Sequence, residues 1–264
     1  MLLSRILMCC WLGVISAHLN ASDKHIYKVA VSDIPTNVYT NADNKKILRP
    51  EIKGILKEIF RRVDIDFELS NYPPARVYDG LKNGKVELWL GVPGVNFIED
   101  YVVYGKSKLS DLDISVYSLD AKVVNSVEDL SGQSVVLLHG YGYGNSRPYF
   151  DDEKNNVRVH IAHSRESAFK MLQNRRADYL LDYKQAVNAF ATTNTNIPIF
   201  QTYDLGKIPV MFVGSKRVKH MDKLLKELDL VVHDMYSSGR LGAVEDSIKS
   251  NNKRYLQPIK PLDE

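Results

Sequence analysis

The chain has 264 residues, a formal net charge of +3 at pH 7 and 44% hydrophobic residues. Its 35 basic and 32 acidic residues are dispersed along the chain, which excludes the strongly basic surface expected of a nucleic-acid-binding or membrane-surface protein. Length and composition predict a water-soluble protein of one or two globular domains.

The first 21 residues have the three-part layout of a secretory signal peptide. Arg5 supplies a positive charge, residues 6–17 (ILMCCWLGVISA) form an apolar run, and Ala17 and Ala21 are small residues that suit cleavage. The run is shorter than the roughly 20 residues that a membrane-spanning helix needs. We therefore predict a leader at residues 1–21 and a periplasmic or secreted protein; an uncleaved core helix is the alternative.

Both cysteines, Cys9 and Cys10, lie inside this apolar run. The small residues that precede a lipidated cysteine are missing, so a lipoprotein start is the weaker interpretation. The processed chain then contains no disulfide, although its destination is oxidising. A chain of roughly 240 residues can be stabilised by its hydrophobic core alone.

After the leader, apolar periodicity predicts alternating strands and helices. The predicted strands are 26–32, 65–69 and 86–91, and the predicted helices are 50–63 and 74–83. Pro50 suits the first turn of its helix, and Gly84 suits the position just after the second helix.

The alternation restarts after an irregular stretch at residues 118–132. The predicted strands here are 134–138, 157–161, 178–182 and 208–214, and the predicted helices are 165–174, 183–191 and 218–238. Ser164 is a suitable N-cap for the first of these helices. Alternation with short connections predicts parallel sheets and right-handed crossovers, and two such runs predict two α/β lobes.

Four segments resemble passages of the family 3 extracellular solute-binding proteins, the polar amino acid ABC transporter type. They occur in the family's order and span nearly the whole processed chain. The segments are 72–84 (YPPARVYDGLKNG), 127–138 (VEDLSGQSVVLL), 164–182 (SRESAFKMLQNRRADYLLD) and the C-terminal helix pair 224–256.

The resemblance implies an α/β, two-lobed type II periplasmic-binding-protein fold. Its first lobe would be split into residues 22–118 and 212–264, its second lobe would be residues 119–211, and two strands would form a hinge. A small-molecule ligand would lie between the lobes, beyond the carboxyl ends of the strands. The implied partner is an inner-membrane permease complex; a sensor role is the alternative, and we expect a monomer without nucleic acid, metal or cofactor.

Asp182 is the first candidate ligand contact, because it ends a predicted strand. The resemblance implies that an aspartate here accepts the ammonium group of the ligand. Asp182 and Gln185 also match a capping box for the following helix, and both roles can coexist.

The loop Gly140–Ser146 (GYGYGNS) follows a predicted strand and precedes a predicted helix. Its backbone amides suit a carboxylate or another anion, and Tyr141 and Tyr143 would flank the ligand. Its glycine spacing does not match a dinucleotide fingerprint. The alternative is a flexible surface loop.

Arg76 is a candidate contact in the first lobe, because guanidinium binds carboxylate in a bidentate manner. A solvated arginine at a helix start is the alternative. Tyr72 and Tyr39 are candidate aromatic walls, although half-buried tyrosines are ordinary core material. We interpret Trp89, in the middle of a strand, as core.

One departure from the family concerns residues 94–106 (GVNFIEDYVVYGK). Amino-acid-binding members carry an arginine here that binds the ligand's carboxylate, whereas this segment contains none and has Glu99 and Asp100 instead. The departure argues against a standard α-amino acid as the ligand.

The sequence offers little support for an enzyme or a metal protein. It contains no nucleophile elbow, zinc-protease helix or P-loop. His160 and His163 are spaced so that a strand and a turn would separate their rings. A dehydratase or lyase, with Asp182 or His139 as general acid or base, is the least favoured alternative.

Overall fold

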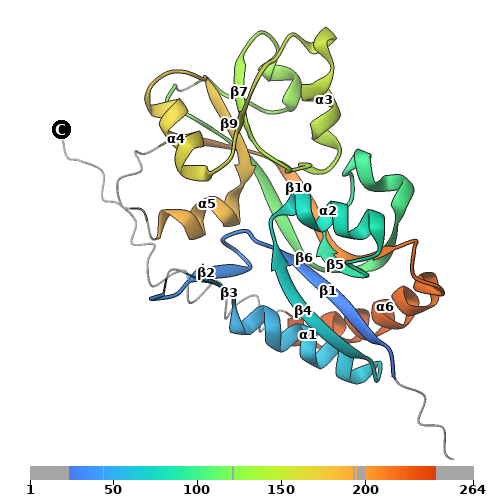
Figure 1. Ribbon diagram of the computed structural model, residues 1–264. Coiled ribbons are helices and arrows are strands. Elements are labelled where there is room, and N and C mark those ends of the chain that lie inside the picture. Colours follow the sequence, from blue (N-terminus) through green and yellow to red (C-terminus); the bar gives the residue numbers. More distant parts are fainter. Residues whose placement is uncertain (1–23, 44, 121, 193, 195–199, 242–264) are drawn as a thin grey trace, which may run out of the picture.

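The computed structural model describes residues 24–43, 45–120, 122–192, 194 and 200–241. The predicted leader and most of the second helix of the predicted C-terminal pair lie outside these residues. One eight-stranded sheet runs through the molecule, and helices flank it in two lobes (Figure 1). In sheet order its strands are β4 (Asp66–Tyr72), β1 (Ile26–Ser32), β5 (Leu88–Gly91), β10 (Gln201–Ser215), β6 (Val102–Ser118), β9 (Tyr179–Tyr183), β7 (Ser134–Leu138) and β8 (Arg158–Ala162).

The first lobe is built on the parallel strands β4, β1 and β5. Successive side chains of a strand face opposite sides, so β1 packs against helices on both. Val29 and Val31 belong to the core with α1 (Pro50–Arg62) and α6 (Met221–Ser237), whereas Ala30 belongs to the core with α2 (Pro74–Asn83). This three-layer arrangement explains why the stretch Val29–Val31 of the strand is apolar on both faces.

The second lobe repeats the arrangement on the parallel strands β9, β7 and β8. Its helices are α3 (Arg147–Asp151), α4 (Arg165–Gln173) and α5 (Lys184–Ala191). Ser164 is the N-cap of α4, as predicted, and its side chain accepts a hydrogen bond from the backbone N–H of Ser167. Apolar residues of this lobe and of the α2 side of the first lobe belong to one continuous core.

Strands β6 and β10 connect the lobes. They are 17 and 15 residues long and pair antiparallel from Val102 opposite Ser215 to Ser118 opposite Gln201. One end of β10 pairs with β5 of the first lobe, and one end of β6 pairs with β9 of the second. Their ladder contains three register shifts, which bend strands locally. These crossing strands form the two-strand connection that we predicted as a hinge.

Most predicted elements are confirmed to within a few residues, but three features were missed. Strand β6 was not predicted, β10 is longer than expected, and a hairpin of β2 (Val38–Thr40) and β3 (Lys46–Leu48) precedes α1. Polar residues interrupt β6 (VVYGKSKLSDLDISVYS), so its apolar periodicity is weak. The remaining elements are short 3₁₀ turns: η1 (Asn96–Tyr101), η2 (Val127–Leu130), η3 (Gly144–Ser146) and η4 (Glu153–Asn155). No helix within the described residues is long and apolar enough to cross a membrane.

Candidate functional site

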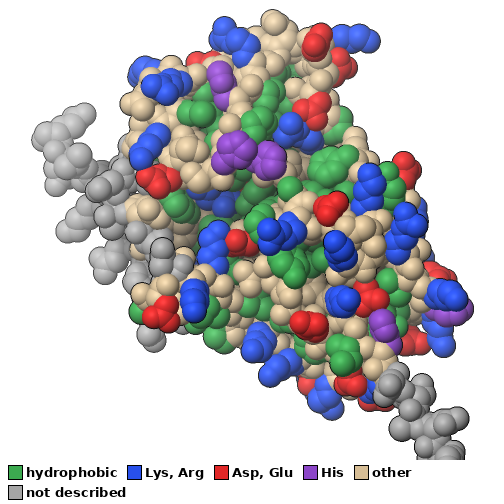
Figure 2. Space-filling model, in the orientation of Figure 1, with side chains coloured by type: hydrophobic (Ala, Val, Ile, Leu, Met, Phe, Trp, Pro, Cys, Tyr) green, Lys and Arg blue, Asp and Glu red, His purple; other side chains and the backbone are tan. Residues whose placement is uncertain are grey.

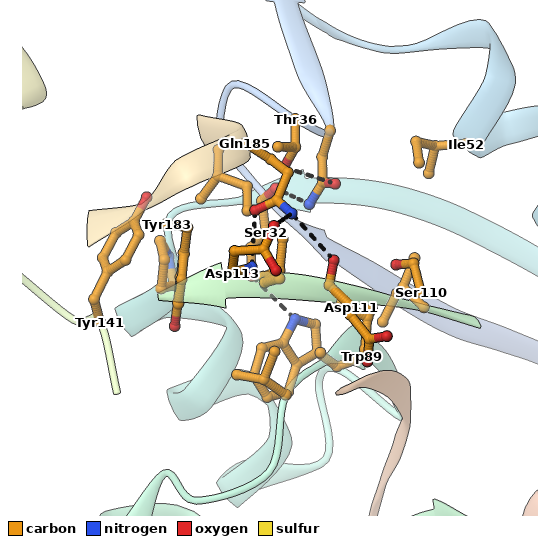
Figure 3. A pocket seen from close by; sticks show the side chains of 18 of the residues that line it. Ser32, Thr36, Ile52, Trp89, Ser110, Asp111, Asp113, Tyr141, Tyr183 and Gln185 are labelled. Carbon is orange, nitrogen blue, oxygen red and sulfur yellow. Dashed lines mark hydrogen bonds between the residues drawn. The ribbon is translucent and has the colours of Figure 1, made fainter. Parts of the chain in front are cut away.

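A cavity of about 290 Å³ lies between the two lobes, where β6 and β10 cross. The first lobe contributes residues that follow β1, such as Thr36, together with Tyr78 and Trp89. The second lobe contributes Tyr141 and Tyr183. Figure 3 shows side chains from these distant segments converging on one space. A concave, mostly apolar site with a few polar groups is the usual form of a small-molecule site.

Aromatic side chains from both lobes form much of the cavity wall. Trp89 and Tyr78 meet edge to face with ring centroids 5.4 Å apart, and the rings of Tyr141 and Tyr183 are 5.6 Å apart. The indole N–H of Trp89 donates to the hydroxyl of Ser32 at 3.0 Å, which fixes the ring. All four rings are buried. Trp89 is therefore core, as predicted, but it also lines the cavity.

The polar part of the cavity comes mainly from the crossing strands. Asp111 and Asp113 project from β6 (Figure 3). Lys207 of β10 also lines the cavity. Gln185 of α5 donates its side-chain N–H to Asp113 at 2.9 Å, and its oxygen accepts the backbone N–H of Asp113 at 3.0 Å. The ammonium of Lys207 lies 3.8 Å from the Asp113 carboxylate. Gln185 thus ties the second lobe to the crossing strands.

Asp182 does not line the cavity but forms a buried ion pair behind its wall. The Arg165 guanidinium donates to both Asp182 carboxylate oxygens, at 2.7 and 2.9 Å, and to the Tyr141 hydroxyl at 3.2 Å. The side chains of Arg165 and Asp182 are 7% and 0% exposed, so water barely screens the pair. Arg165 therefore anchors Tyr141, which does line the cavity.

Burial sets the pKa values in this cluster. It raises the pKa of the Tyr141 hydroxyl to about 12, against the opposing effect of the Arg165 guanidinium. Burial is the largest single effect on Arg165 and acts to lower its pKa, but the Asp182 carboxylate and the Tyr141 hydroxyl together outweigh it, so the pKa of Arg165 is raised. Arg165 thus stays charged, and its guanidinium is committed to Asp182 and Tyr141.

The predicted capping box of α5 is wrong. The N-cap residue is Tyr183, and no side chain accepts a capping hydrogen bond there. Asp182 instead accepts the backbone N–H of Tyr183, and Gln185 turns toward β6. The buried cation beside Asp182 gives the carboxylate a stronger partner than the helix start does. Whether Asp182 contacts the ligand stays a prediction.

The loop at residues 140–146 is not a flexible surface loop. Tyr141 and Tyr143 are buried, and the Tyr143 hydroxyl accepts the backbone N–H of Leu138 at 2.8 Å. Ser146 is half-buried in η3 and does not line the cavity. The helix that follows, α3, has only five residues, so it adds little dipole to any anion site. Of the predicted loop contacts, Tyr141 alone lines the cavity.

The same loop contacts the first lobe across the gap between the lobes. A Cβ on Gly140 would lie 3.2 Å from the backbone nitrogen of Ala75, and one on Gly142 would lie 2.8 Å from Cγ2 of Val95. Ala75 and Val95 belong to the first-lobe segments around α2 and η1. The two lobes are therefore in contact, and they approach this closely because Gly140 and Gly142 have no Cβ.

The predicted first-lobe contacts lie outside the cavity wall. Arg76 is exposed, and its guanidinium sits 5.7 Å from the ring centroid of Tyr72 as a cation–π pair. Tyr72 is half-buried against the core. Tyr39 is 40% exposed on the hairpin. The structure thus brings Arg76 and Tyr72 together but places Tyr39 elsewhere.

The segment that lacks the family arginine forms the turn η1. Glu99 is exposed there and accepts a hydrogen bond from the Tyr104 hydroxyl at 2.9 Å. Asp100 is also exposed. Neither carboxylate lines the cavity, so the acidic residues of this turn do not replace the missing arginine as cavity groups.

The histidines make a different pair from the one considered in the sequence. The rings of His139 and His163 lie 5.0 Å apart. Within the part of the chain that the structure describes, no three His, Cys, Asp or Glu side chains are grouped to hold a metal ion. On the face shown in Figure 2, basic and acidic side chains are interspersed over both lobes.

Several cavity residues were not among the site residues predicted from the sequence. Asp111 and Asp113 lie in β6, which was not predicted, and Lys207 lies just before the predicted start of its strand. The available signal was the short alternation of residues 111–114 (DLDI), in which polar and apolar residues interchange as they do on a half-buried strand.

Comparisons with known proteins find the fold but no close relative. No protein-family model matches the chain, and no curated protein does. A variant of ArgBP from T. maritima is 17% identical, with a TM-score of 0.65 over 85% of this chain and 95% of that chain. The GluR0 ligand-binding core, in complex with L-glutamate, is 12% identical, with a TM-score of 0.66 over 89% and 100% of the two chains.

A third solved structure is a histidine kinase sensor domain with similarity to periplasmic binding proteins. It is 13% identical, with a TM-score of 0.69 over 85% of this chain and 96% of that chain. The matches cover 85–89% of this chain and 95–100% of the solved chains, which confirms the predicted two-lobed periplasmic-binding-protein fold. The residue boundaries of the lobes stay a prediction.

Proposed function

We propose that this chain is an extracytoplasmic solute-binding protein that closes two lobes around one small organic molecule. In this proposal it is a member of the family 3 solute-binding proteins. The predicted leader directs it across the membrane to the periplasm or beyond, and the bound ligand is passed to an ABC-type permease complex.

The cavity between the lobes carries this proposal. Its wall combines residues of the first lobe, the second lobe and both crossing strands. A ligand that contacts all of them interacts better with the closed arrangement than with an open one. Such a ligand shifts the population toward closure, which is how hinged two-lobed proteins signal occupancy.

Capture without turnover fits the candidate acid–base groups. Asp182 is fully buried and ion-paired with Arg165, so its carboxylate is not presented to the cavity. His139 is exposed and does not line the cavity. ArgBP is known in an arginine-bound form and the GluR0 core in a complex with L-glutamate. A sensor domain shares the fold, so a receptor partner is the alternative to a permease.

Trp89 provides a direct test. The chain has two tryptophans, Trp11 in the predicted leader and Trp89 in the cavity wall. In a Trp11→Phe chain Trp89 is the single tryptophan, so the tryptophan fluorescence reports on the surroundings of this cavity-wall residue. We expect a ligand found by thermal-shift screening of amino acids, amines, organic acids and short peptides to change this fluorescence saturably and to be recovered intact.

Two results would contradict the proposal. A ligand that raises the melting temperature but leaves Trp89 fluorescence unchanged binds somewhere other than the cavity. Recovery of a chemically altered ligand would favour the enzyme alternative over capture.

A further inference from the structure

The charged groups around the cavity are arranged asymmetrically. Three carboxylates lie at or beside it, and each has a lysine within 4 Å. In each pair the carboxylate is the more buried partner. Side-chain exposures are 10% for Asp33 against 57% for Lys46, 31% for Asp111 against 44% for Lys108, and 27% for Asp113 against 70% for Lys207. Water screens the exposed ammonium groups, so a molecule in the cavity meets mainly the carboxylates.

Asp33 adds an unsatisfied acceptor. It lies between Ser32 and Ile34, which both line the cavity, and its charge is close enough to contribute to the raised pKa of Tyr141. Its Oδ2 accepts from Lys46 at 2.8 Å, whereas its Oδ1 is buried without a hydrogen-bond partner among the described residues. Asp33 does not itself line the cavity, but a buried carboxylate oxygen without a donor leaves its negative charge only partly compensated, which favours a cation in the adjacent cavity.

The aromatic wall suits the same kind of ligand. A cation within about 6 Å of an aromatic face is attracted by the ring, most strongly when water is excluded. The rings of Tyr78, Trp89, Tyr141 and Tyr183 are all less than 10% exposed and line the cavity.

An anchor for a ligand carboxylate is missing from the cavity. Among the described residues that line it, none is an arginine. Arg165, which contacts the cavity residue Tyr141, already donates to both oxygens of Asp182. Lys207 is the cationic group in the wall, and it faces Asp113.

We propose that the cavity selects an organic cation, an amine that carries no carboxylate, through Asp111 and Asp113 in its wall, through the negative charge of Asp33 beside it, and through the aromatic wall. This inference rests on the proposed function and names the ligand class for it. Charge-assisted hydrogen bonds to the carboxylates orient the ammonium, and the apolar body of the ligand lies against the rings.

Matched pairs of probes test the ligand class. The Trp11→Phe chain is titrated with agmatine against arginine, putrescine against ornithine, and tyramine against tyrosine, following Trp89 fluorescence and melting temperature. We expect an amine to bind at least tenfold more tightly than the amino acid of the same skeleton. Asp33→Asn, which keeps the size of the side chain, should weaken amine binding at least tenfold.

Asp120→Asn is the matched control, because Asp120 is 60% exposed and pairs with Arg175 on the surface. It should leave amine affinity unchanged. If amino acids or organic acids such as succinate bind and change Trp89 fluorescence while the amines do not, the ligand class is wrong and capture between the lobes stands. If no compound of the panel changes either signal, both proposals are overturned. Equal losses of amine affinity in Asp33→Asn and Asp120→Asn would also overturn the role of the Asp33 charge beside the cavity.

Discussion

Closure of the lobes can be perturbed at Gly142 without disturbing either lobe. Gly142 is not among the residues with a positive φ, so alanine is compatible with its backbone. Its Cβ would lie 2.8 Å from Cγ2 of Val95, closer than side-chain carbons approach one another. Because Val95 lies in the opposite lobe, an open arrangement of the lobes would relieve this crowding.

The structure sets the size of the effect. Inserting one methyl group into a packed contact costs about 1–3 kcal/mol. The cost falls on the closed state alone, so Gly142→Ala should raise the ligand dissociation constant by about 5–150-fold. The free energy of unfolding should change little. Isothermal titration with the ligand found in the screen measures the first quantity, and urea denaturation measures the second.

Two further variants make the test specific. Gly54→Ala lies on α1 with nothing within 4 Å of the added carbon, so it should leave affinity unchanged. Val95→Ala removes Cγ2, so the double variant Gly142→Ala, Val95→Ala should recover affinity relative to Gly142→Ala. Unchanged affinity in Gly142→Ala would show that binding does not require this contact. Loss of affinity that Val95→Ala fails to restore would refute crowding as its cause.

Three other outcomes follow from the structure. Asp182→Asn should lower the free energy of unfolding by about 3–5 kcal/mol in urea denaturation, because it leaves the Arg165 charge buried without its partner. The double variant Asp182→Leu, Arg165→Met should recover most of this loss, because it removes both charges. A loss below about 1 kcal/mol in Asp182→Asn would contradict a buried ion pair. Burial raises the folded-state pKa of Tyr141 to about 12, above its unfolded value near 10. The contribution of the neutral hydroxyl to stability is therefore present below pH about 10 and is lost as the pH rises toward 12. Urea denaturation midpoints that stay constant between pH about 10 and 12 would contradict the raised pKa of Tyr141. The secreted protein should lack residues 1–21, and an intact N-terminus in its mass spectrum would disprove the leader.

Local sequence patterns were sufficient for most of the framework. The apolar stretches 29–31 and 135–138 identify strands covered on both faces, and Ser164 marks the start of α4 because its hydroxyl can satisfy an orphan N–H. These signals depend on neighbours within a few residues, so they are readable without the fold. Strand β6 was missed because its pairing with β10 and β9, rather than its own composition, makes it extended.

The site depended on contacts that only the tertiary structure creates. The sequence singled out Asp182 correctly as a carboxylate at a strand end, but its partner is Arg165, brought beside it by the packing of α4 on β9. The environment of a charge is set by burial and by its nearest opposite charge, which are properties of the folded chain. For the same reason Trp89 and Asp113, which are 24 residues apart in sequence, line one cavity only in the folded chain. The crossing strands that join the two lobes bring them together.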